Sequence, residues 1–226
     1  MCCIESGKTQ TFMNRITISV LTTFILLITG CDWLGVRGNG HITTDQRAVT
    51  AFSEIEAEGA FEIEWRSGAP ALSITTDENL LQYIDSREIN NRLRLHSRDH
   101  IRPTHGVKVV VSSPTRSAAK LTGATRLTAN QLSGAKFAVE STGAARVALD
   151  GSIDELLADM TGASDLKAKS LRTKTAQIST TGAADADVSV SDTLKVSITG
   201  AGKVNYSGNP TIEKHITGAG SIRHRE

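Results

Sequence analysis

The sequence predicts an all-β protein whose body is a β-solenoid, a stack of short strands in coils of 18–20 residues. Two observations carry this prediction. The tripeptide Thr-Gly-Ala occurs six times, with its threonine at positions 122, 142, 161, 181, 199 and 217, so that the steps are 20, 19, 20, 18 and 18 residues. Within each step apolar and polar residues alternate, which is typical of a strand that buries one face.

Equivalent positions of successive repeats carry the same kind of side chain. Five residues after each threonine every residue is apolar, and three residues before it every residue but Lys214 is apolar. The first of these columns is Leu127, Val147, Leu166, Ala186, Val204 and Ile222, and the second is Ala119, Val139, Ala158, Ile178, Val196 and Lys214. An alternation of two nested in a longer repeat indicates coils that turn one face inward.

The repeated glycine explains why one turn recurs. Stacked strands lie about 4.8 Å apart, so equivalent turns must lie directly over one another. A corner repeated in register needs a residue that tolerates positive φ or a close backbone approach, and glycine supplies both properties. The threonines beside them could form a hydroxyl ladder. We therefore expect six structural turn glycines: Gly123, Gly143, Gly162, Gly182, Gly200 and Gly218.

A charged column, four residues after each threonine, is consistent with this stacking. Arg146 would face Asp165, and Asp185 would face Lys203. Exposed ion pairs contribute only about 0–1 kcal/mol each, so they would tune register more than stability. The column is imperfect, because Arg126 would face Arg146 and Asp165 would face Asp185.

Residues 42–226 read as a single domain, in which residues 42–118 form a first strand-rich part and residues 119–226 form the repeat coils. Apolar residues alternate with charged ones over residues 61–65, and valines alternate over residues 107–111. Both patterns predict half-buried strands.

One short helix is predicted in this first part, over residues 77–84. Leu80, Leu81 and Ile84 have helical spacing, and Asp77 precedes them as a candidate N-cap.

The N-terminus has the pattern of an exported lipoprotein. Residues 13–31 combine a short positive start, a mostly apolar run and the closing sequence Ile-Thr-Gly-Cys, which resembles a bacterial lipobox. Cleavage before Cys31 would leave its thiol as the lipid attachment site. Residues 1–31 are thus an upstream extension plus a signal peptide, with either Met1 or Met13 as the true start, and the glycine-containing segment 32–41 is expected to be a flexible tether.

The mature chain resembles the head-GIN-domain family of auto-transporter-adhesin-like bacterial envelope proteins. The resemblance covers "GNGHITTDQRAVTAFSEIEAEGAFEIEW" (residues 38–65), "LSITTDENLLQYI" (residues 72–84) and the Thr-Gly-Ala coils. It implies an all-β, solenoid-like body at the cell surface or in the periplasm. It implies no established activity and no catalytic motif, so no functional residues are carried over.

Composition excludes several classes of function. The formal net charge is +1 without a basic block, which does not fit nucleic-acid binding, and aromatic residues are only 4%. The phosphate-loop, dinucleotide-binding and nucleophile-elbow motifs do not occur. We expect no cofactor.

Three clusters could carry chemistry, and each has a simpler interpretation. His96, His100 and His105 could meet on zinc, but they fit a polar loop better, and no metal site is assigned. Glutamates spaced by two are what the outer face of a strand presents. These are Glu54, Glu56, Glu58, Glu62 and Glu64.

The third cluster is a set of aspartates in the repeats. Asp165, Asp185 and Asp187, with Asp192 nearby, could line a carboxylate patch with calcium, as in β-helix enzymes that act on acidic polysaccharides. Flanking Arg146 and Lys203 offset their charge. Coils this short also leave no long loop to wall a cleft.

The function expected is therefore a noncatalytic one, structural, adhesive or binding, exerted through a solenoid surface by a lipid-anchored envelope protein. The alternative is a polysaccharide-active β-helix enzyme that uses Asp165, Asp185 and Asp187. Expected partners are the membrane, through the lipid, an extended protein or glycan, and other copies of the chain. The charged C-terminal "IRHRE" (residues 222–226) could cap the last coil. Which membrane holds the anchor is left open.

Overall fold

The structure is a computed structural model that describes residues 35–225, of which Val36 onward form one compact unit. Cys31 and the rest of residues 1–34 lie outside the described residues, as does Glu226. The elements are β1 (Val36–Arg37), β2 (Ile42–Arg47), β3 (Glu54–Gly59), β4 (Phe61–Ser67), β5 (Ala71–Asp77), η1 (Glu78–Tyr83), β6 (Ile84–Ile89), β7 (Arg92–Ser97), β8 (Ile101–Arg102), β9 (Val107–Ser113), β10 (Ala118–Gly123), β11 (Arg126–Gly143), β12 (Arg146–Gly162), β13 (Asp165–Gly182), β14 (Asp185–Gly200), β15 (Lys203–Ser207), β16 (Thr211–Gly218) and β17 (Ser221–His224).

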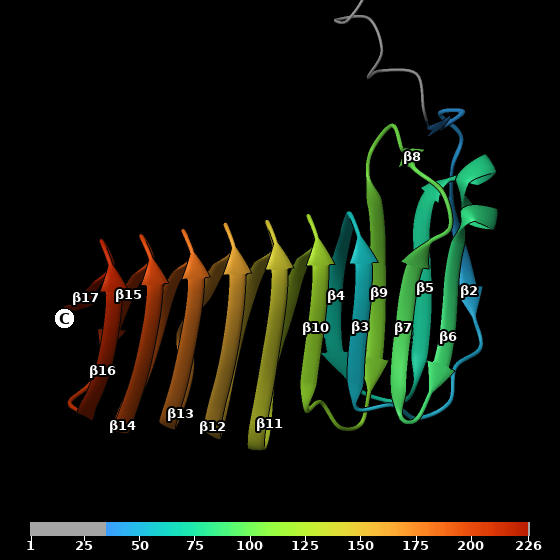
Figure 1. Cartoon of the computed structure of the whole chain (residues 1–226). Coiled ribbons are helices and arrows are strands. Elements are labelled where there is room, and N and C mark those ends of the chain that lie inside the picture. The colour runs from blue at the N-terminus through green and yellow to red at the C-terminus, as the bar shows by residue number, and fades with distance from the viewer. Residues whose placement is uncertain (1–34, 226) are drawn as a thin grey trace, which may run out of the picture. The chain divides into compact units, whose positions relative to one another are not determined.

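The prediction of an all-β solenoid is confirmed. Strands β11 to β14 each pair in parallel with the strand one repeat later, nearly residue for residue. Each of them takes part in two ladders: residues 126–129 of β11 pair with β4, whereas residues 138–143 pair with β10. The chain therefore winds as a flattened coil with two sheet faces, seen as the row of parallel arrows in Figure 1.

The two faces can be named by the order of their strands. The front ladder runs β6-β7-β3-β10, then through the second halves of β11 to β14, to β16. The back ladder runs β2-β5-β9-β4, then through the first halves of β11 to β14, to β15 and β17. Pairing is antiparallel between β6 and β7, β2 and β5, and β5 and β9, and parallel in the repeats. The first part and the repeats thus share both ladders.

The corner between the ladders is a stack of glycines. Gly123 is in register with Gly143, and the register continues through Gly162, Gly182, Gly200 and Gly218. All six have positive φ. The carbonyl oxygen of each corner glycine from Gly123 to Gly182 accepts a hydrogen bond of 2.8–3.0 Å from the alanine N–H of the next coil. The corner is therefore both a turn and a backbone ladder.

A seventh corner lies outside the Thr-Gly-Ala pattern and was not predicted. Gly59 is in register with Gly123, has a φ of 140°, and accepts a hydrogen bond of 3.0 Å from the N–H of Ala124. The triplet there reads Glu58-Gly59-Ala60, so a search for Thr-Gly-Ala does not find it. The solenoid consequently begins with β3 and β4, ahead of the recognisable repeats.

The core lies between the two ladders. Inward residues of the repeat columns, such as Leu127, Leu166 and Ile178, are fully buried. Near the start of the solenoid the core also contains aromatic rings: Trp65 lies 6.2 Å from Phe52 and 6.0 Å from Phe137 of β11, measured between ring centroids. In the later coils the core is filled by aliphatic side chains, among them Leu171, Leu194 and Val204.

The predicted helix is a 3-10 helix, and the predicted cap is wrong. The Asp77 side chain makes no hydrogen bond to the first turn of η1. Its buried carboxylate instead accepts hydrogen bonds from the N–H of Gly40 at 2.7 Å, and from the N–H and the hydroxyl of Thr104, both at 2.8 Å. The local spacing located the helix, but a contact across 37 residues determines the role of Asp77.

Part of the predicted flexible tether is ordered. Val36 and Arg37 pair in parallel with Ile101 and Arg102. A Cβ atom on Gly38 would lie 2.3 Å from the Cγ atom of Asp77, so only glycine fits there. Residues 36–40 are thus held against the body by β8 and Asp77.

Candidate binding surface

Paired charges line the outer side of the front ladder over β3 and β7. These strands pair in register, which sets each outward glutamate of β3 beside a basic residue of β7. The closest contacts are Glu54 Oε2 to Arg92 Nη2 at 2.7 Å, Glu56 Oε1 to Arg94 Nη2 at 2.9 Å, and Glu58 Oε2 to His96 Nδ1 at 3.3 Å. The hydrogen bonds that Arg92 donates to the Glu54 carboxylate raise the pKa of Arg92.

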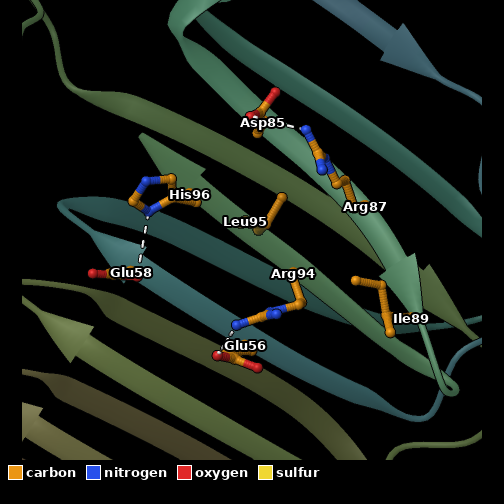
Figure 2. Close-up of a pocket in the computed structure, with 8 residues that line it drawn as sticks. All are labelled: Glu56, Glu58, Asp85, Arg87, Ile89, Arg94, Leu95 and His96. Carbon is orange, nitrogen blue, oxygen red and sulfur yellow. Dashed lines mark hydrogen bonds and ion pairs between the residues drawn. The ribbon is translucent and has the colours of Figure 1, made fainter. Parts of the chain in front are cut away.

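A shallow pocket of about 330 Å³ opens on this surface (Figure 2). Its lining residues are Glu56, Glu58, Asp85, Arg87, Ile89, Arg94, Leu95 and His96. Asp85 is hydrogen-bonded to Arg98, and this contact lowers the pKa of the Asp85 carboxyl. Ile89 is 45% exposed, one of only four large apolar residues so exposed in the part of the chain that the structure describes. The pocket therefore offers mixed charges and one apolar side chain.

A second hollow, of about 600 Å³, lies beside the segment that follows β7. Its floor is the glycine corner with Ala60, Phe61 and Ala124, and one wall is the segment 97–103. The wall is fixed, because Thr104 is bonded to Asp77. Glu58 and Val107 also line this hollow, so its lining is both charged and apolar.

The three histidines do not form a metal site. His96 contacts Glu58, and the His105 Nδ1 atom lies 3.0 Å from the Thr104 hydroxyl. Within residues 35–225, no group of three or more His, Cys, Asp or Glu side chains is placed to hold a metal ion.

Two members of the predicted aspartate patch are neighbours, since Asp165 and Asp185 are in register on the back ladder. Each carboxylate nevertheless has a structural contact. Asp165 lies 3.5 Å from Lys167 Nζ, and Asp185 accepts a 3.0 Å hydrogen bond from the N–H of Lys203. Asp187 contacts Asn205 and Arg225, and Asp192 accepts a hydrogen bond from the Ser191 hydroxyl. The contacts of Asp185 and Asp187 tie neighbouring strands together, whereas those of Asp165 and Asp192 lie within one strand.

The glutamates divide between the two faces. Glu54, Glu56 and Glu58 lie on the front ladder, whereas Glu62 and Glu64 belong to β4 on the back ladder, with Arg126 and Arg66 as partners. Arg92 and Arg94, the partners of the front glutamates, were not predicted from the sequence. Their alternation in "NRLRLHS" matches that of "EIEAE", and only the register of β3 with β7 reveals the pairing.

Comparison with known proteins agrees with this architecture. Residues 51–210 match the family model described as "Putative auto-transporter adhesin, head GIN domain". The chain belongs to the head GIN domain family. No curated protein matches this head GIN chain significantly.

Two solved structures share the head GIN fold with this chain. A structure described as a "putative adhesin" from Bacteroides fragilis NCTC 9343 is 21% identical, with a TM-score of 0.70, over 84% of this chain and 100% of that one. Another, described as a "putative adhesin" from Parabacteroides merdae ATCC 43184, is 18% identical, with a TM-score of 0.53, over 85% of this chain and 100% of that one. Among the described residues of the head GIN chain, no helix is long and apolar enough to cross a bilayer.

Proposed function

We propose that this head GIN protein is a cell-envelope protein that binds or adheres to an extended partner through the outer side of its front ladder, and that a lipid on Cys31 anchors it. Membership of a family described as adhesins supports a binding role. The proposal gives the chain no catalytic step.

One observation carries the choice of surface. Over β3 and β7 the charges form regular rows, Arg92 and Arg94 against Glu54 and Glu56, on strands whose positions the ladder fixes. Such a surface is rigid before it meets a partner, so little conformational entropy is lost on binding. Rows of both signs suit a long partner that carries its own repeating charges.

The surface is tested with the full chain in lipid vesicles, passed over arrays of acidic glycans, neutral glycans and extracellular matrix proteins. Arg94→Glu should lower retention on the preferred partner about tenfold, because it reverses one charge of the row. Lys203→Glu makes the same charge change on the back ladder and should leave retention unchanged. If both variants lose retention equally, or if neither loses any, the result would contradict the proposed surface.

The anchor is tested by metabolic labelling with a fatty acid. Wild-type protein should carry the label and Cys31→Ser should not, because the thiol is the proposed attachment atom. Label that persists in Cys31→Ser would refute attachment at this residue.

The noncatalytic assignment is open to direct challenge. The full chain is incubated with acidic and neutral polysaccharides, with and without calcium, and soluble products are measured. We expect no release above buffer. Release that Asp165→Ala or Asp185→Ala abolishes would replace binding by polysaccharide cleavage.

A further inference from the structure

The terminal coil presents an unpaired strand edge. β16 pairs with β14 on one side, and no strand of residues 35–225 pairs with its other side. All eight residues of β16 are exposed, including Ile212 and Ile216 at 37% each. Backbone N–H and C=O groups along such an edge can hydrogen-bond to another strand.

The sequence of β16 is nearly symmetric about Lys214. Residues 211–217 read Thr-Ile-Glu-Lys-His-Ile-Thr. In an antiparallel pair of two such strands, with the two lysines opposite each other, threonine would face threonine, isoleucine would face isoleucine, and glutamate would face histidine. Cross-strand pairs of these kinds are favourable.

The pairs would also fall on the correct sides of the sheet. Ile212 and Ile216 are in register with Leu194 and Ile198, which are buried, so they point inward at the open end of the core. Glu213 and His215 alternate with them and face outward, where Glu213 Oε2 lies 3.0 Å from Lys195 Nζ. Apolar contacts would therefore form inside, and polar contacts outside.

We propose that the free edge of β16 binds the same edge of a second copy of this chain, antiparallel and with a two-fold axis at Lys214. The inference rests on the proposed adhesive function and names a partner for it. β16 and β2 lie at opposite ends of the body (Figure 1). Pairing through β16 places the two N-terminal ends at the far ends of the dimer, which suits copies anchored on facing membranes.

Lys214 keeps this pairing weak. It occupies the inward column of the buried Val196, and in the pair it faces its own copy. Like charges directly opposite each other are destabilising, and an inward lysine is a known protection of strand edges. Single contacts would then be reversible, and firm attachment would require many copies on each membrane.

The test uses the full chain in lipid vesicles whose aggregation is followed by light scattering. One variant, Glu213→Lys/His215→Lys, makes both outward positions of the edge positive, and another, His215→Glu, makes both negative. Wild-type vesicles should aggregate reversibly, and each variant alone should stay dispersed. The two variants mixed should aggregate, because the antiparallel register sets each lysine against a glutamate.

A matched pair of control variants tests whether added charge anywhere on the front ladder, and not only on the β16 edge, would disperse the vesicles. Gln177 and Ser179 occupy the same outward columns two coils earlier, inside the ladder. Replacing both by lysine, or both by glutamate, should leave homotypic aggregation intact. Two results would overturn the antiparallel pairing. One is that vesicles carrying either β16 variant alone still aggregate. The other is that the mixture of the two variants stays dispersed while wild-type vesicles aggregate.

Lys214→Val gives an independent reading that does not need the charged variants. It continues the Val196 column and removes the like-charge contact, so half-maximal aggregation should occur at about fivefold lower protein density. Dispersed vesicles with both wild type and Lys214→Val would refute the proposal. Retention on the glycan and matrix arrays would be unaffected by that outcome, so the proposed function fails or survives separately.

Discussion

Single residues at the corner show how tightly the coils are stacked. A Cβ atom placed on Gly162 would lie 2.4 Å from the carbonyl oxygen of Gly143, and one on Gly143 would lie 2.8 Å from that of Gly123. Relief would require the coils to separate, because the obstacle is backbone. Gly134 also has positive φ, 130°, but a Cβ atom there would meet nothing within 4 Å.

Gly162→Ala should therefore destabilise the protein by about 3 kcal/mol, from the strained φ together with the collision. Gly134→Ala carries only the strain and should cost about 1 kcal/mol. Urea denaturation of both variants measures the difference. Equal losses would mean that the stacked backbone adds nothing to the requirement for glycine.

Asp77 links three distant segments, and its titration should be visible in stability. Burial would raise the pKa of Asp77, but hydrogen bonds from Thr104 and Gly40 outweigh it and hold the pKa below its ordinary value. The charged form thus stabilises the fold. This contribution is complete above the unfolded pKa of about 3.9, and it is lost as pH falls through the lower folded pKa.

Asp77→Asn should lower the free energy of unfolding at pH 7 by about 2–3 kcal/mol, since charge-assisted hydrogen bonds are lost. It should also remove part of the fall in stability below pH 4. Urea midpoints of both proteins from pH 7 to pH 2.5 give the comparison. Parallel acid profiles would show that Asp77 is not the group responsible.

The role of a residue could be predicted where it depends on a pattern in the nearby sequence, and not where it depends on a distant partner. The six Thr-Gly-Ala corners repeat in the chain, so their stacking could be inferred from spacing. Gly59 could not, because a glutamate replaces the threonine beside it. Asp77 has the local pattern of a cap, but its partners Gly40 and Thr104 are distant in sequence, and no pattern encodes such contacts.

At the scale of the elements, one side chain, that of Arg116, holds the link between β9 and β10 against the neighbouring strands. Arg116 is buried, and its guanidinium donates to the carbonyl oxygens of Trp65 at 3.1 Å, Asn130 at 2.7 Å and Gln131 at 2.6 Å. Burial lowers the pKa of Arg116, and the nearby charge of Asp150 opposes this effect. The residue satisfies carbonyl groups of two coils at the corner opposite the glycines.

Arg116→Met keeps much of the apolar volume but removes every donor. Three carbonyl groups would lose their partner, so we expect a loss of about 3 kcal/mol. Arg116→Lys should recover only a part, because an ammonium group cannot copy the planar fork. Thermal and urea unfolding measure both variants. A methionine variant as stable as wild type would show that water replaces the guanidinium.

At the level of elements the strands were more predictable than their partners. Alternation located the strands over residues 61–65 and 107–111, which the structure assigns to β4 and β9. It could not show that β9 pairs in parallel with β4 and antiparallel with β5, because alternation is the same for both directions. The charged surface over β3 and β7 depends on such a pairing, so sequence patterns alone did not reveal it.

For the molecule as a whole, the coils are linked mainly to their immediate neighbours. In such a fold stability is roughly a sum of terms between adjacent repeats, and a terminal repeat has one neighbour instead of two. β16 and β17 each pair on one side, whereas β12 and β13 pair on both.

Amide hydrogen exchange should therefore be graded along the body. Exchange should be fastest in β16 and β17, and slowest in β12 and β13, with rates that differ by about a hundredfold or more. Exchange followed by mass spectrometry measures each segment. Uniform exchange across the coils would indicate a single cooperative unit.

The in-register corners also make the length of the body adjustable. Gly143 and Gly162 occupy equivalent places, so an in-frame loss of residues 144–162, one repeat of 19 residues, would remove one full coil and let the flanking corners meet. Each such event would change the reach of the protein by about 4.8 Å and leave both ends intact. Recombination that joins one corner to another would thus produce longer and shorter forms of the protein, each with an unbroken interior.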